Sequence, residues 1–250
     1  MALQVGLERP AAPKGFFACL PGVVIYPFRG SGLLVLFVAT LVFAGMQIMS
    51  AGLVIILAKM IALGYLFSYM QNIIHSTAAE DQEMPPLPGL DELFGAFFRL
   101  AGTVLISFSV AIGLLVAKFF NVDIPTSAII ITGIFGSLYF PMAFLAVAMK
   151  DNAMSANPLI VIPAILKVPL QYIVAAILFA SIFGISQLGN RVMGGVAGVS
   201  LTTRSTSVLL ISFALMAGWS FFSVYLLTIN MRILGLLYLT NKHKLGWFSR

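Results

Sequence analysis

The stretch GLLVLFVATLVFAGMQIMSAGLVIILAKMIALGYLFSYMQNII, residues 32–74, is apolar over more than forty positions and holds one charge, Lys59. As a single α-helix it would be roughly 60 Å long, twice the hydrocarbon thickness of a bilayer. We therefore expect two membrane spans, 33–49 and 53–74, joined by a turn at 50–52. A turn at Lys59 would keep the charge in water, but no Gly, Pro, Asn or Ser lies beside it. With the turn at 50–52, Lys59 is a buried charge inside the second span, with its amine reaching outward.

The composition of the whole chain agrees with this interpretation. Of its 250 residues, 60% are hydrophobic and only 9% are charged, whereas soluble domains carry about 25% charged residues. Backbone groups in lipid must pair internally, so such a chain spans a membrane as helices or as a closed barrel. Barrel strands alternate apolar and polar residues, and the unbroken apolar runs here do not. We predict an all-α fold, a polytopic transmembrane helical bundle of about six spans with short interfacial helices.

The later spans are predicted from apolar runs and their breaks. We expect spans three to six at 100–117, 127–149, 169–188 and 208–230. Asn157 before Pro158 is a good helix start and predicts a short surface helix that ends near Lys167. The Gly-, Ser- and Thr-rich stretch 189–207 predicts a loop. The chain then divides into five parts: an N-terminal interfacial segment (1–30), a transmembrane hairpin (31–75), an acidic cytoplasmic junction (76–99), a four-span part (100–238) and a basic tail (239–250).

The charges indicate topology and not nucleic-acid binding. The net charge is +6, but the 14 basic residues stand singly at the ends of apolar runs, without a basic stripe. With six spans, ten of the 14 fall on the side that holds both termini. Positive residues favour the cytoplasmic side. We expect a protein of the cell inner (cytoplasmic) membrane with both termini and the acidic junction in the cytoplasm.

The junction carries five of the chain's eight acidic residues, which are Glu80, Asp81, Glu83, Asp91 and Glu92. A proline-rich spacer at 84–88 precedes a stretch with apolar residues at 90, 93, 94 and 97, which predicts an amphipathic helix along the interface. His75 near Glu80 and Asp81 suggests a cation site, but charge runs are more often solvated or interaction segments. We favour a partner-docking surface and expect no metal.

Polar residues near the ends of the second and sixth spans form a second candidate site. Such residues in membrane helices face partners or cavities and avoid lipid. The candidate polar cluster is Tyr65, Tyr69, Asn72, His75, Asn230 and Arg232. The alternative is plain hydrogen bonding between helices.

Several short motifs resemble those of a bacterial family of polytopic membrane proteins of unknown function, itself similar in fold to the Yip1-like and phosphodiesterase-membrane-domain groups. The motifs are 26–30 (YPFRG), 64–66 (GYL), 76–78 (STA), 85–88 (PPLP), 140–143 (FPMA), 156–159 (ANPL), 234–238 (LGLLY) and 245–248 (LGWF). The resemblance implies an integral membrane domain of five to six helices and assigns no active site.

No nucleotide-binding loop, zinc-ligand spacing or nucleophile motif occurs in the chain. We therefore expect no catalytic residues, no cofactor and no enzyme activity, and as partners we expect membrane lipids and other membrane proteins, not nucleic acid. The oligomeric state is left open. The leading hypothesis is a scaffold or accessory subunit of a membrane complex. The alternative is a small-solute or lipid transporter or channel, which requires a cavity lined by Tyr65, Tyr69 or Asn230. Against ion coupling, no acid lies inside a span to partner Lys59.

Overall fold

The computed structural model describes residues 15–30, 32–48, 53–89, 93–202 and 205–248. Within these ranges the chain is helical and contains no β-strand, as predicted. The elements in chain order are α1 Phe16–Cys19, η1 Leu20–Val23, η2 Tyr26–Phe28, α2 Gly32–Ile48, α3 Leu53–Ala78, α4 Leu93–Ser107, α5 Ser109–Phe119, α6 Thr126–Lys150, η3 Ala153–Ala156, α7 Pro158–Lys167, α8 Pro169–Thr202 and α9 Thr206–Leu245.

Three of the described helices are long and apolar enough to cross a membrane, namely α6, the Pro169–Val196 part of α8, and α9. The chain is thus a helical membrane protein. A fourth candidate arises if α4 and α5 count as one span, although they are bent by 73° at their junction. In α2, the segment Gly32–Val42 counts only as a shorter apolar helix. The prediction of six spans is therefore not confirmed.

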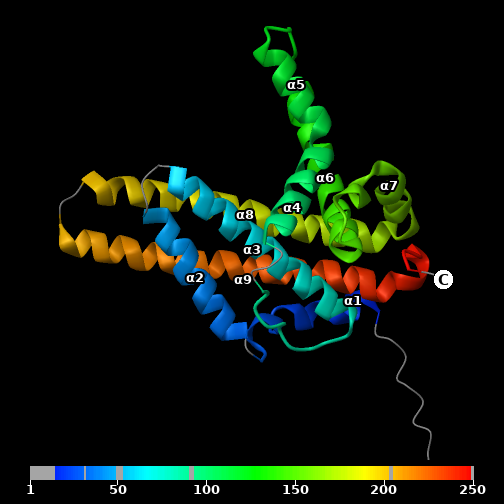
Figure 1. Ribbon diagram of the computed structural model, residues 1–250, viewed down its shortest axis with the longest axis horizontal. Helices are drawn as coiled ribbons and strands as arrows, with labels where there is room; N and C mark the ends of the chain where they lie inside the picture. The colour runs from blue at the N-terminus through cyan, green and yellow to red at the C-terminus, as the bar shows by residue number, and fades with distance from the viewer. Residues whose placement is uncertain (1–14, 31, 49–52, 90–92, 203–204, 249–250) are drawn as a thin grey trace, which may run out of the picture.

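The long helices α8 and α9 run side by side as an extended hairpin, and α2 and α3 pack against α9 (Figure 1). The predicted loop at 189–207 is wrong in most of its length, because α8 continues to Thr202 and α9 begins at Thr206. Glycine weakens helices in water, but it is frequent in membrane helices, where backbone groups have no water to pair with. The predicted basic tail is also largely helical, and Gly246 ends α9 in the left-handed region at φ 63°.

The predicted third span is broken. α4 ends at Ser107 and α5 begins at Ser109, with Phe108 between them outside helical geometry at φ −109°, ψ 12°. Gly136 of α6 makes room for the bend, since a Cβ there would lie 2.6 Å from Cδ1 of Phe108. Beyond the bend, α5 and the first half of α6 project from the rest of the molecule (Figure 1).

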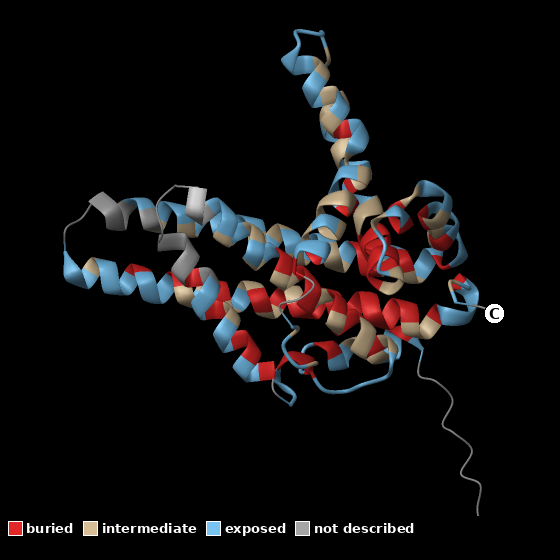
Figure 2. Ribbon diagram, viewed as in Figure 1, coloured by how far each residue is buried: buried red, intermediate tan, exposed pale blue. Residues whose placement is uncertain are grey.

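The core lies where the second half of α6 meets α3, α4, α8 and α9. Residues Met142–Ala148 are fully buried, and Phe144 packs edge-on against Phe67 with ring centroids 5.0 Å apart. Leu234 and Leu237 of α9 complete this centre. Figure 2 shows the buried residues gathered there, while the first turns of α9 and the projecting arm are largely exposed. Those exposed apolar surfaces suit contact with lipid.

Two further expectations concern α7 and Lys59. The surface helix predicted after Asn157 is present as α7, and the Asn157 side chain caps it by accepting a hydrogen bond from the Leu159 N–H at 2.9 Å. Lys59, predicted to be a buried charge inside the second span, lies exposed on the surface of α3, and its depth in a bilayer stays a prediction. The turn predicted at 50–52 lies outside the described residues, although α2 and α3 flank it as expected.

Candidate functional site

The acidic junction begins with a sharp turn at the end of α3. The Glu80 N–H donates to the Thr77 carbonyl at 3.1 Å and the Asp81 N–H to the Ser76 carbonyl at 3.0 Å. This pair of bonds is the Schellman pattern that closes helix ends. Glu80 occupies the left-handed position, φ 71°, usually taken by glycine. The turn reverses the chain, so that the junction runs back across the end of α3.

The junction's main chain is anchored by side chains from three different elements. Arg232 of α9 donates from Nη1 to the Asp81 carbonyl at 2.7 Å. The Tyr26 hydroxyl of η2 donates to the Glu83 carbonyl at 3.2 Å, and the Ser76 hydroxyl donates to the same oxygen at 3.5 Å. The Tyr69 hydroxyl of α3 donates to the Pro85 carbonyl at 3.3 Å. The acceptor in each of these four bonds is a backbone carbonyl, so none of the four uses an acidic side chain.

Arg232 links α9, α3 and the N-terminal segment. Its Nη1 also donates to the Thr77 hydroxyl at 3.0 Å, and its guanidinium lies 4.2 Å from the centroid of the Tyr26 ring. That separation is within the range of a cation–π interaction. One turn further, Gly235 lets α9 approach α3, since a Cβ there would lie 2.5 Å from Cβ of Thr77. The absence of a side chain at Gly235 therefore helps to place Arg232.

Tyr26 is enclosed, with 1% of its surface exposed. Burial raises the pKa of the Tyr26 hydroxyl above its ordinary value, and the neighbouring Arg232 opposes part of that rise. The phenol therefore keeps its proton at neutral pH and remains a hydrogen-bond donor to the junction.

The acidic side chains themselves face outward. Glu80, Asp81 and Glu83 are exposed, and Glu80 makes a long ion pair of 3.9 Å with Lys242, both groups being solvent-accessible. Such a pair contributes little stability, because water screens it. The docking residues Asp91 and Glu92 lie outside the described residues.

The structure brings together only part of the predicted polar cluster. Tyr69 and Arg232 meet at the junction, where they hold the carbonyls of Pro85 and Asp81. Tyr65, Asn72 and His75 are half-buried on α3. Asn230 is 3% exposed, and its Oδ1 has no hydrogen-bond partner among the described residues.

Sequence reasoning missed Tyr26, Ser76 and Thr77, because a Tyr near the start of the chain gives no sign of packing under an Arg two hundred residues later. It also gave Arg99 no role beyond being one of the 14 basic residues that indicate topology. In the fold, Arg99 of α4 donates from Nη2 to Gln71 at 3.2 Å, and Gln71 donates to Asp151 at 3.4 Å. This chain of contacts joins α4, α3 and the end of α6.

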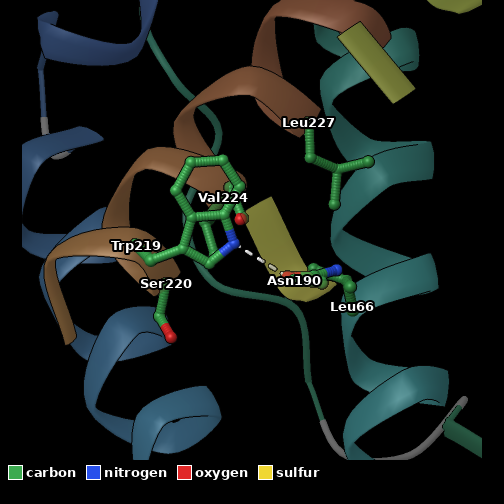
Figure 3. A pocket seen from close by; sticks show the side chains of 7 residues that line it. Leu66, Asn190, Trp219, Ser220, Val224 and Leu227 are labelled. Atoms are coloured by element: carbon green, nitrogen blue, oxygen red, sulfur yellow. Dashed lines mark hydrogen bonds between the residues drawn. The ribbon is translucent and has the colours of Figure 1, made fainter. Parts of the chain in front are cut away.

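Two cavities lie between the described helices. One, of about 860 Å³, lies between the N-terminal segment and the end of α9, with Tyr26, Arg29, Arg232 and Lys242 in its wall. The other, of about 220 Å³, lies beside Trp219, whose Nε1 donates to Asn190 at 2.8 Å (Figure 3). Neither is lined by Tyr65, Tyr69 or Asn230, the residues required by the transporter hypothesis.

In the part of the chain that the structure describes, no three His, Cys, Asp or Glu residues are grouped so that they could hold a metal ion. Comparison with protein-family models, curated proteins and solved structures finds no match to this chain. The family resemblance drawn from the sequence motifs therefore stays a prediction.

Proposed function

We propose that the protein is a non-catalytic scaffold or accessory subunit of a membrane complex, and that its acidic junction binds a basic segment of a partner protein. The observation that carries the proposal is the anchoring of the junction through its carbonyls at Asp81, Glu83 and Pro85. The main chain is held in one shape while three carboxylates remain at the surface.

A binding segment held in this way has an advantage over a mobile loop. Its backbone is already ordered, so association does not have to immobilise it, and more of the interaction energy appears as affinity. Exposed carboxylates at Glu80, Asp81 and Glu83 present a concentrated negative charge. That charge would speed encounter with a basic partner and orient it.

The proposal places the junction and both termini in the cytoplasm, at the inner membrane. Its support is the bias of basic residues toward the same side of the predicted spans. The basic end of α9, with Lys242, His243 and Lys244 in its last turn, lies next to the junction through the contact between Lys242 and Glu80. Cysteine-accessibility labelling at position 81 would test the orientation, and labelling from outside alone would contradict it.

The docking proposal is tested by removing charge without disturbing the anchors. A triple variant, Glu80→Gln, Asp81→Asn and Glu83→Gln, keeps every junction carbonyl. Asp123→Asn is the matched control, because Asp123 is an exposed acid in the distant connection between α5 and α6. Tagged proteins are purified from native membranes in mild detergent, and co-purifying proteins are quantified.

We expect a partner that co-purifies with the wild type and with Asp123→Asn. The amount of this partner should fall at least tenfold with the triple variant. Salt should release it, because salt screens exposed charges. Recovery of the wild-type protein alone, or of the same partners with the triple variant, would contradict the proposal. Circular dichroism of each variant confirms that the helices are intact.

A further inference from the structure

The larger cavity has walls of two kinds. It lies between the N-terminal segment α1–η2, which runs along α9, and the last turns of α9 (Figure 1). Phe16 and Val23 on one side and Leu236 and Leu239 on the other are apolar lining residues. At about 860 Å³ the cavity is within the size range of ligand sites.

The rest of the wall is strongly basic. Arg29, Arg232, Lys242 and Lys244 line the cavity, together with His243, and Glu80 is the single acidic residue among the described lining residues. Arg29, Lys242 and Lys244 are exposed at the rim of the recess, and like charges gathered around one recess add to one positive field. The recess therefore attracts an anion, and its apolar walls suit a ligand that also carries hydrocarbon.

The Arg232 side chain in this wall is fixed by contacts with its neighbours. The guanidinium is held by Thr77, by the Asp81 carbonyl and by the Tyr26 ring. Arg presents planar, fixed donors that match phosphate oxygens, while Lys supplies mobile point charges. The wall of one recess thus holds a fixed Arg and, about three helical turns further along α9, two lysines, and these are side chains that bind phosphate.

We propose that this cavity binds the phosphate of an anionic headgroup, with the apolar walls contacting the adjoining glycerol and acyl carbons of a membrane lipid. Basic recesses beside membrane helices are known sites for anionic headgroups. A soluble phosphate ester shares the headgroup chemistry and is distinguished by experiment. The inference goes beyond the docking proposal and does not depend on it.

The test uses the full-length protein in detergent and native mass spectrometry with dioctanoyl phosphatidylglycerol. The probe variant is Lys242→Gln with Lys244→Gln, which leaves the Arg232 anchors in place. The control variant is Lys59→Gln with Lys118→Gln, which removes the same charge from two exposed lysines elsewhere. We expect roughly 30-fold weaker binding in the probe variant, from ~1 kcal/mol per lysine near an anionic headgroup, and wild-type binding in the control.

Competing ligands identify the recognised group. Dioctanoylglycerol, which has no phosphate, should not bind, and zwitterionic dioctanoyl phosphatidylcholine should bind at least tenfold more weakly than phosphatidylglycerol. Glycerol phosphate as tight as the lipid would assign the site to a soluble phosphate ester, and binding of the lipid alone would assign it to the membrane. Equal binding of dioctanoylglycerol, or equal losses in the probe and control variants, would overturn the proposal.

A third variant separates this proposal from the docking proposal. Glu80→Gln removes the acidic lining residue that competes for Lys242, so phosphatidylglycerol should bind severalfold more tightly. The same substitution should weaken a basic protein partner. Unchanged or weaker phosphatidylglycerol binding by Glu80→Gln would contradict the phosphate proposal, whatever happens to the protein partner, and loss of the basic partner alone bears on the docking proposal only.

Discussion

The two halves of α6 have similar apolar sequences and opposite surroundings. In the first half, Ile134 and Phe135 are 57% and 68% exposed on the projecting arm, whereas Met142–Ala148 of the second half are fully buried. Hydrophobicity alone therefore does not distinguish a surface that meets lipid from a surface that meets other helices. The difference comes from the partners of each half, and paired substitutions along this one helix can measure it.

The largest expected effect comes from a pair of phenylalanines. Phe144→Ala removes a fully buried ring that packs against Phe67 and Phe140. It should lower the free energy of unfolding by about 3 kcal/mol, the low end for core Phe→Ala, because lipid replaces water as the reference for exposed apolar groups.

Phe135→Ala is the matched change on the projecting half of the same helix. Its ring is mostly exposed, so the loss should stay below about 0.5 kcal/mol. Both free energies of unfolding can be measured by titrating the protein in mild detergent with SDS and following the loss of helix by circular dichroism. Equal losses would mean that the arm is packed against something as tightly as the core.

The sequence predicted the parts of the fold that depend on local chemistry. Asn157 and Pro158 specified α7, and the apolar runs specified α2, α3 and α6. The bend at Phe108 could not be predicted, because it depends on space left by Gly136, a residue almost thirty positions later. The predicted loop at 189–207 was wrong for a related reason: glycines weaken helices in water, but this segment belongs to a membrane helix that packs along α9.

The candidate site shows the same division. Tyr69 and Arg232 were identified because polar residues near the ends of apolar spans are conspicuous. Their role could not be predicted, because they donate hydrogen bonds to backbone carbonyls. Every residue has such a carbonyl, so the sequence does not mark which ones are bound. The sequence predicted that the acidic side chains bind a partner. The structure adds that side chains from other elements form hydrogen bonds to the backbone carbonyls of this segment.

A pair of glycines in α6 gives the next largest effect. An alanine Cβ at Gly136 would lie 2.6 Å from the Phe108 ring and 2.8 Å from the Ser107 carbonyl, so Gly136→Ala must displace the bend between α4 and α5. Overpacking of this kind costs about 1 to 3 kcal/mol. At Gly133 a Cβ would meet nothing within 4 Å, so Gly133→Ala should change the free energy of unfolding by less than about 0.5 kcal/mol. The same SDS titration measures both, and a stabilised Gly136→Ala would show that the bend is not required.

The smallest effect concerns Tyr26, which holds the junction at the packed end of the molecule. Tyr26→Phe keeps the ring beneath Arg232 and removes the hydrogen bond to the Glu83 carbonyl, which should cost about 1 kcal/mol. Because burial raises the pKa of Tyr26 in the folded state, its contribution is complete below the unfolded value of about 10 and declines as the pH rises above it. Between about pH 10 and 11 the wild type should therefore lose more stability than Tyr26→Phe. Parallel curves for the two proteins would show that the Tyr26 proton is not linked to folding, and that the junction is held by Arg232 and Tyr69 without it.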